Sequence, residues 1–239
     1  MRSIVLRQRI IKSLGYIVIS LFIMSVSIAF TINFTPLYIV DIDYLNITDY
    51  VNVSKEQIIL NYRILMDYLN MPWITDLAMP DFPSSERGLF HFYEVKRLFM
   101  FNYLILAAAG SGTYFFMRYI KSRNLYKSLL IYFKNGIFLS LTVIVGILIS
   151  FDSLFLLFHQ SFFNNDAWLF NPATDPIILI LPAEFFMHNF LLAFGLVEIL
   201  LITGYVLTKR KTRDISLLSK KKEVGKQVGF EKEISTKIN

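Results

Sequence analysis

The stretch LLIYFKNGIFLSLTVIVGILIS, from Leu129 to Ser150, decides the class of fold. It contains a single charged residue, Lys134, and it is longer than the roughly 20 apolar residues that a helix needs to cross a bilayer. In hydrocarbon a spanning segment has to satisfy its own backbone hydrogen bonds, and an α-helix does so within itself. The stretch therefore predicts a transmembrane helix.

Three other stretches have the length and apolar character of membrane spans, namely Leu14–Asn33, Leu98–Ile120 and Ile177–Leu207. The composition agrees, because 55% of the 239 residues are hydrophobic and the mean hydropathy is +0.52, values typical of integral membrane proteins. The chain has no cysteine, which excludes disulfides, thiol nucleophiles and thiolate metal sites. We therefore predict an all-α membrane protein with four transmembrane helices.

Basic residues mark one side of the predicted membrane protein, since they gather in residues 1–13, in the loop 121–128 and in the tail 208–239. The connections 34–97 and 151–176 hold most of the acidic residues and few basic ones. By the positive-inside rule, both termini and the loop 121–128 are expected in the cytoplasm, and the two acidic connections outside the cell. The tail is expected to be disordered and to touch anionic headgroups. The net charge of +6 thus reflects membrane topology, and we expect no nucleic-acid partner.

The connection 34–97 is too long for a simple loop and is expected to form a small extracellular cap. Within it, Ser54 followed by Gln57 has the spacing of a helix capping box. One apolar stripe then follows at three- and four-residue spacing: Ile58, Tyr62, Leu65 and Leu69. The pattern does not decide whether this stripe faces the rest of the cap or the lipid interface.

Two of the three histidines stand at the same predicted membrane face. His91 precedes the second span and His159 follows the third, so both are expected at the outer interface at similar depth. An imidazole has an ordinary pKa of about 6.5 and exchanges protons at ambient pH, which makes the pair a candidate for acid–base catalysis. The alternative is that each histidine only forms hydrogen bonds at the headgroup level.

Carboxylates lie near both histidines in the sequence. Glu94 is three residues after His91 and therefore on the same face of a helix, while Glu86, Asp166 and Asp175 are the further candidates. A carboxylate that accepts an imidazole N–H orients the ring and strengthens it as a base. The same side chains could hold zinc. No H-E-x-x-H or similar spacing is present, however, and we expect neither a metal nor another cofactor.

The sequence around and after the second of these histidines is rich in aromatic residues. An aromatic belt at the membrane interface would account for them, and a pocket for acyl chains would account for them equally well. In the second interpretation the lining residues are Phe158, Phe162, Phe163, Trp168, Phe170, Phe185 and Phe186. Asn164, Asn165 and Asp166 would then supply polar contacts, and the two asparagines could hold an oxyanion.

Two motifs carry a resemblance to a known family. The first is SSERGLFHFYEVK, from Ser84 to Lys96, in which a histidine stands shortly before a membrane span. The second runs as FHQSFF (158–163), NDAW (165–168), NPATD (171–175) and LPAEFF (181–186). On these motifs the chain resembles the lipoprotein intramolecular transacylase (Lit) family of Gram-positive membrane proteins, over about residues 10–208. The third histidine, His188, matches neither motif.

The resemblance implies an enzyme that moves the sn-2 acyl chain of a diacylglyceryl lipoprotein to the α-amino group of its N-terminal cysteine, giving a lyso-form lipoprotein. It also implies that His91 and His159 are the catalytic acid–base pair at the boundary between cap and membrane. Family members tend to have an aspartate three residues after the first histidine, where this chain has Glu94. The expected partners are the lipoprotein and membrane lipids, and a monomer in the cell membrane is expected.

Two other functions remain open on the sequence alone. A non-enzymatic sensor or assembly subunit would use the cap to bind a partner, and alanine at His91 or His159 would leave lipid chemistry unchanged. A lipid ester hydrolase would use the same histidines on water and release free fatty acid, whereas a transacylase makes an N-acylated cysteine.

Overall fold

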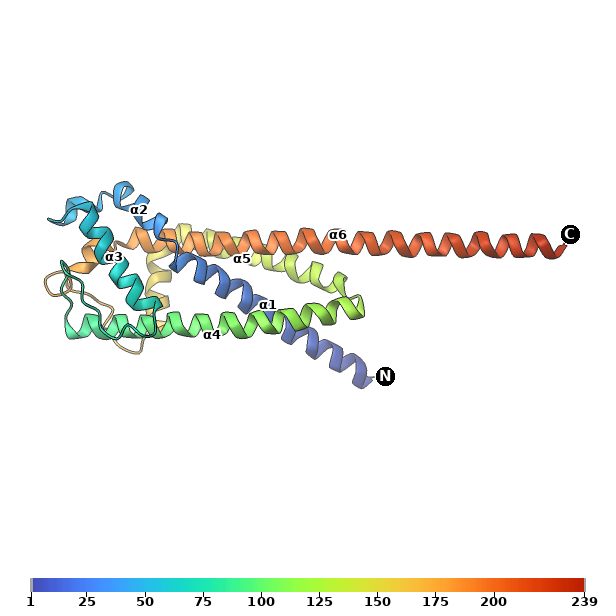
Figure 1. Ribbon diagram of the computed structural model, residues 1–239, viewed down its shortest axis with the longest axis horizontal. Helices are drawn as coiled ribbons and strands as arrows, with labels where there is room; N and C mark the ends of the chain where they lie inside the picture. Colours follow the sequence, from blue (N-terminus) through green and yellow to red (C-terminus); the bar gives the residue numbers. More distant parts are fainter. Residues whose placement is uncertain (1, 239) are drawn as a thin grey trace.

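Four long helices form the body of the molecule (Figure 1). The computed structural model describes residues 2–238. The helices are α1 (Arg2–Ile32), α4 (Glu86–Arg123), α5 (Tyr126–Phe162) and α6 (Ala183–Ile238), and each is long and apolar enough to cross a membrane. The described residues contain no strand. The prediction of an all-α membrane protein with four spans is confirmed.

Glycines allow the long helices to approach one another closely. A methyl group at Gly15 of α1 would lie 2.2 Å from the ring of Phe116 on α4, and one at Gly204 of α6 would lie 2.5 Å from Phe133 on α5. Small residues at helix interfaces are what membrane bundles use to bring backbones together. The residues buried between these helices form one apolar cluster: Ile19, Ile23, Phe116, Ile120, Leu129, Phe133, Val197 and Leu201.

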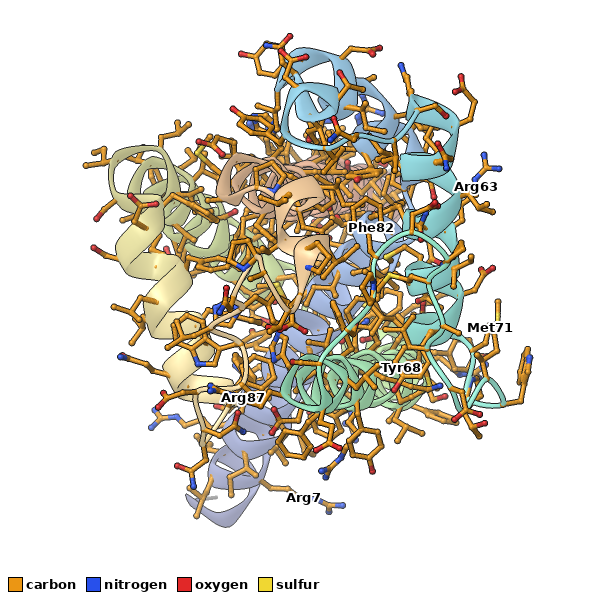
Figure 2. The ribbon with its side chains drawn as sticks, turned by 90° about the vertical axis from the view of Figure 1, so that its left-hand side faces the viewer. Arg7, Arg63, Tyr68, Met71, Phe82 and Arg87 are labelled. Atoms are coloured by element: carbon orange, nitrogen blue, oxygen red, sulfur yellow. The ribbon has the colours of Figure 1, made fainter. Side chains whose placement is uncertain are left out.

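Helix α5 is kinked at Ser150, whose backbone angles (φ −148°, ψ 51°) are not helical. After the kink, residues 151–162 form a helical segment that turns across the bundle instead of continuing along it (Figures 1 and 2). The predicted span 129–150 therefore ends where the kink lies, but the first half of the connection 151–176 is helix and not loop. Leu and Phe dominate this segment, which lacks glycine and proline, so nothing in it stops a helix.

The start of the fourth span was predicted too early. Residues Pro176–Ile180 form a short 3-10 helix, and α6 begins only at Ala183, after Pro182. Ile177 and Ile180 are fully buried, and the hydroxyl of Tyr38 donates a hydrogen bond of 2.8 Å to the carbonyl of Ile180. These apolar residues therefore belong to the cap, because hydropathy does not distinguish a side chain buried in protein from one that faces lipid.

The cap packs around two further helices, α2 (Thr35–Tyr44) and α3 (Lys55–Asn70), with a short 3-10 turn at Ile47–Tyr50. Both hydrogen bonds of the Ser54–Gln57 capping box are present. The apolar stripe of α3 faces the cap interior and not lipid, and the ring of Tyr62 on this stripe stacks on Tyr38 with centroids 3.8 Å apart. Phe185, at the start of α6, joins the same cluster.

The basic tail differs from expectation, because α6 continues as helix to Ile238 (Figure 1). Disorder was expected from the charge of residues 208–239. The tail contains no proline, and its most frequent residue is lysine, which favours helix over other backbone conformations.

Candidate active site

The structure brings His91 and His159 together at the cap end of the bundle. His91 lies in the second turn of α4, and His159 lies near the end of the α5 segment that crosses the bundle. The ring centroids are 6.0 Å apart, and the planes are inclined by 34°. The two residues are only 6% and 8% exposed, although imidazoles are polar. Two buried rings from separate helices at this distance can both reach one small reacting group.

A backbone hydrogen bond fixes the tautomer of His159. Its Nδ1 lies 2.8 Å from the carbonyl oxygen of Phe155, one turn earlier in the same helix. A carbonyl can only accept, so Nδ1 carries the hydrogen and the Nε2 lone pair of the neutral ring is left free. Nδ1 of His91 is buried and has no hydrogen-bond partner. Each histidine thus keeps one ring nitrogen available for a substrate.

Aromatic rings enclose the histidine pair on several sides. Phe163 presents its ring to both, with centroids 4.7 Å from His91 and 5.6 Å from His159. Trp168 lies 4.6 Å from His159, and Phe170 lies 5.5 Å from His91. Such walls exclude water and strengthen electrostatic interactions inside the site.

The other predicted aromatic residues divide between the site and its surroundings. Phe158 lies 5.5 Å from His159, whereas Phe162 is 57% exposed and faces outward. Phe185 packs in the cap core, and Phe186 reaches the site only through a contact with Phe155. The ring of Phe155 itself lies 4.2 Å from His159, nearer than any predicted one. Sequence reasoning missed it because it stands in an apolar run that resembles a lipid-facing helix.

Glu94 and Asn165 form a hydrogen-bonded pair beside the histidines. The amide of Asn165 donates to Oε1 of Glu94 over 2.9 Å, and its own Oδ1 accepts from the backbone N–H of Ala167. The second carboxylate oxygen, Oε2, is buried and has no partner. Asn165 is therefore engaged in holding Glu94 and the loop after α5, which differs from the predicted role of holding an oxyanion.

Asp175 organises the start of α4. It accepts hydrogen bonds from the backbone N–H and the hydroxyl of Ser85, at 2.8 and 2.9 Å, and Ser85 is the N-cap of that helix. Gly88 leaves the necessary room, because a methyl group there would lie 2.2 Å from Oδ1 of Asp175. Asp175 thus positions the helix that carries His91, and no hydrogen bond links it to either histidine among the described residues.

Three other predicted residues are exposed: Glu86, Asn164 and Asp166. Asp166 contributes through its backbone carbonyl, which accepts a hydrogen bond of 2.8 Å from Arg87. This bond ties the loop after α5 to the first turn of α4. Among the described residues, no group of three histidine, aspartate or glutamate side chains is placed to hold a metal ion.

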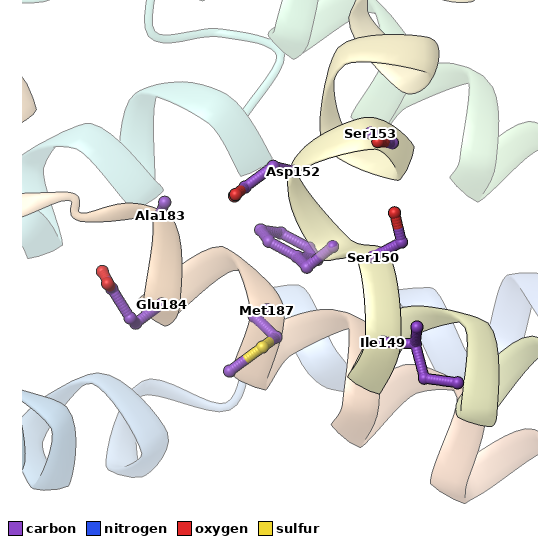
Figure 3. A pocket seen from close by; sticks show the side chains of 8 residues that line it. Ile149, Ser150, Asp152, Ser153, Ala183, Glu184 and Met187 are labelled. Atoms are coloured by element: carbon purple, nitrogen blue, oxygen red, sulfur yellow. The ribbon is translucent and has the colours of Figure 1, made fainter.

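A cleft of about 330 Å³ opens at the kink of α5 (Figure 3). It lies between the kink and the first turns of α6, and its lining comprises Ile149, Ser150, Phe151, Asp152, Ser153, Ala183, Glu184 and Met187. Neither histidine lines it. Phe151 contacts Phe155 at 5.6 Å between centroids, and Phe155 contacts His159, so one phenylalanine separates the cleft wall from the histidine pair.

Comparisons with known proteins agree with this geometry. The sequence profile of the lipoprotein intramolecular transacylase Lit family matches residues 13–186, which is more than half of the chain. No curated protein sequence matches.

Among solved structures, the membrane-integral lipoprotein intramolecular transacylase Lit from Bacillus cereus is 30% identical and has a TM-score of 0.78, over 90% of this chain and 97% of the other. A histidine-to-alanine variant of that protein is 29% identical with a TM-score of 0.77, over 87% and 95% of the two chains. A histidine-to-arginine variant is 29% identical with a TM-score of 0.74, over 94% and 99%. The chain therefore belongs to the lipoprotein intramolecular transacylase (Lit) family of membrane acyltransferases.

Proposed function

We propose that this chain moves the sn-2 acyl chain of a diacylglyceryl lipoprotein to the α-amino group of its N-terminal cysteine, with His91 and His159 as the acid–base pair. Family membership supports the general activity. The observation that supports the mechanism is the pairing of two buried imidazoles 6.0 Å apart, each with a nitrogen left free by the protein.

The chemistry needs two proton transfers. The amine nitrogen attacks the ester carbonyl, the new N–C bond forms, and the bond from that carbon to the glyceryl oxygen breaks. The amine gives up one proton and the glyceryl oxygen takes up one, so the reaction is balanced without water or a co-reactant. Nε2 of His159 is suited to accept the amine proton because its tautomer is fixed. The imidazolium so formed would pass this proton by way of His91 to the glyceryl oxygen, which leaves both rings neutral again.

The protein contributes positioning as well as proton transfer. Ester and amine belong to one substrate molecule, so the site has to fold that substrate until the two groups meet. Phe163 and Trp168 would hold the substrate against the histidine pair and keep out water, which would otherwise hydrolyse the ester.

The cleft at the α5 kink offers a path for the acyl chain. Both histidines are buried, so a membrane-bound substrate needs an opening toward lipid. Ile149, on the rim of the cleft, is 79% exposed, and Phe155 lies between the cleft wall and His159. An acyl chain that lay in this cleft would bring its ester toward the histidines.

The basic segments 1–13, 121–128 and 208–239 support an orientation with both termini in the cytoplasm. The histidine pair would then work on the outer face of the cell membrane, where the lipid-anchored end of a lipoprotein lies. Membrane lipids and the lipoprotein are the partners in this account, and the chain would act as a monomer.

The test is mass spectrometry of an N-terminal lipopeptide. The host is a Gram-positive strain that makes only the diacylglyceryl form, and it expresses the wild type, His91→Ala, His159→Ala or His188→Gln at matched levels. One acyl chain should move onto the amine with no change of mass in the wild type and in His188→Gln, and in neither alanine variant. His188 lies outside the pair and therefore serves as the control.

The same experiment separates the rival functions. Release of free fatty acid with loss of one acyl chain would identify a hydrolase. A lipopeptide that stays unchanged, with the protein present and folded in the membrane, would overturn the proposal.

A further inference from the structure

The turn Met71–Trp73, which follows α3, presents apolar side chains to the surroundings. Trp73 is 73% exposed, more than any other aromatic side chain that the structure describes, and Met71 is 36% exposed. The sequence from Met71 to Thr75 contains no charge. Figure 2 shows Met71 at the margin of the molecule, at the end of α3 that lies beside α4.

Hydrogen bonds set the height of this turn along the bundle. The hydroxyl of Tyr103 donates to Oδ1 of Asn70 at 2.7 Å and accepts from Nδ2 of Asn33 at 2.8 Å. Asn33 directly follows α1, and Tyr103 lies five residues inside the apolar stretch 98–120 of α4. The end of α3 is therefore at the level where two membrane spans leave the bilayer on the cap side.

Lys96 locks the backbone of the turn at this level. Its ammonium group donates to the carbonyl of Met71 at 2.9 Å and to the carbonyl of Ile74, and it lies 4.4 Å from the ring centroid of Tyr68. The side chain is nearly buried, so these carbonyls take the place of water around the charge. The turn is thus held firmly while the side chain of Trp73 projects outward.

The surface of α4 at the same level is lipid-facing in character. Phe101 and Leu104, on either side of Tyr103, are 59% and 68% exposed in a helix that crosses the membrane. Trp73 is a further exposed apolar side chain, in the turn that Lys96 holds beside α4. Tryptophan favours the membrane interface, where its ring lies in the apolar region and its N–H remains near water and headgroups.

We propose that the Met71–Trp73 turn inserts into the headgroup region of the leaflet on the cap side, with Trp73 as an interfacial anchor for the cap. The partner is a lipid surface and not a second protein chain. The anchor would set the height of the cap on the membrane. It would also set the height of His91, which precedes Lys96 by five residues, roughly 8 Å along the same helix. This anchor requires only that the chain spans the membrane, and it is independent of the proposed reaction.

The test uses tryptophan fluorescence in vesicles. The chain has two tryptophans, so Trp168→Phe leaves Trp73 as the only one. The purified full chain is placed in phosphatidylcholine vesicles in which part of the lipid carries bromine on the acyl chains near the headgroup. Bromolipid should lower the Trp73 emission by about twofold, and aqueous iodide should change it little.

Two results would overturn the proposal. Strong quenching by iodide without quenching by bromolipid would place Trp73 in water. Quenching by neither would place it against protein, such as a second copy of the chain. If Trp168→Phe does not fold, the signal of Trp73 is obtained as the difference between the wild type and Trp73→Phe, so the same outcomes apply.

Discussion

The side-chain amide of Asn165 donates a hydrogen bond of 2.9 Å to Oε1 of Glu94, which links the loop after α5 to the helix that carries His91. The two histidines lie on different helices. His91 is near the start of α4 and His159 is near the end of α5, and the rest of both helices lies on the same side of the site. The pair therefore depends on contacts at this end of the bundle to keep its spacing. The Glu94–Asn165 bond and the Arg87–Asp166 bond are two such contacts.

Asn165→Ala should lower the rate of acyl transfer by roughly tenfold, because a hydrogen bond to a charged group contributes about 1.5–3 kcal/mol. The loss is expected in kcat more than in KM, since Asn165 positions Glu94 and the loop but is not expected to touch the substrate. Initial rates of purified proteins on a synthetic diacylated lipopeptide would measure it. Asn164→Ala, at the exposed neighbouring position, is the control. Equal rates for the two variants would show that the bond has no part in positioning.

Gly88→Ala should destabilise the protein, because the added methyl group would meet the carboxylate of Asp175 at 2.2 Å. Asp175 would have to leave Ser85, and the N-cap arrangement of α4 would be lost. Thermal unfolding of the purified protein would show a lower midpoint. Gly146→Ala, where nothing lies within 4 Å of the new methyl group, should leave the midpoint unchanged or raise it. A midpoint for Gly88→Ala at or above that of the control would contradict the packing described.

His188→Leu should destabilise the cap in a pH-dependent way. Asp41 of α2 is buried beside His188 of α6, with 2.8 Å between Oδ1 and Nδ1. Burial raises the pKa of Asp41, and the hydrogen bond and charge of His188 oppose that rise. Without His188 only the effect of burial remains, so folding would favour the protonated carboxyl more strongly.

The sign of the pH effect follows from linkage. A carboxyl whose pKa is raised by folding does not lower the free energy of unfolding at a pH where it is protonated in both the folded and the unfolded state. As pH rises through the pKa of the folded state, the free energy of unfolding falls. The unfolding midpoint of His188→Leu should therefore fall further below that of the wild type as pH rises from acidic to neutral. His188→Gln, which can still donate to Asp41, should show a smaller deficit. A deficit that is equal at every pH would exclude the Asp41 carboxyl as its source.

Met187→Trp should slow acyl transfer by filling the cleft at the α5 kink. Met187 lines this cleft, and a larger side chain would occupy the space assigned to the acyl chain. The reduction should grow with the length of the acyl chain in a series of synthetic lipopeptides. Ile199→Trp is the control, because Ile199 is exposed on the same helix and does not line the cleft. A reduction that is independent of chain length would argue against the cleft as the path.

Some parts of the architecture could be predicted from sequence because they depend on local pattern. The four spans follow from apolar length, and the Ser54–Gln57 capping box follows from two residues at fixed spacing. The start of the fourth span could not be located in this way. Ile177 and Ile180 are as apolar as membrane residues, yet they are buried in the cap by contacts with residues far away in the chain.

The sequence predicted which residues take part in the site better than it predicted which of them contact one another. The sequence places His91 and His159 at one membrane face, but their distance depends on the kink at Ser150, which turns the end of α5 across the bundle. Ser150 is flanked by Ile149 and Phe151, so no glycine or proline predicts a kink at this position. The nearness of Phe155 to His159 and the pairing of Asn165 with Glu94 are tertiary contacts, so neither has a local signature.

The most direct test of the central claim is a crossover experiment with the purified protein. One lipopeptide carries an isotope-labelled sn-2 acyl chain on an unlabelled peptide, and the second carries an unlabelled chain on a labelled peptide. Mass spectrometry of an equimolar mixture should find each acyl chain on the amine of its own peptide, with no mixed product. His91→Ala and His159→Ala should give neither product. Mixed products, or label recovered as free fatty acid, would contradict intramolecular transfer by the histidine pair.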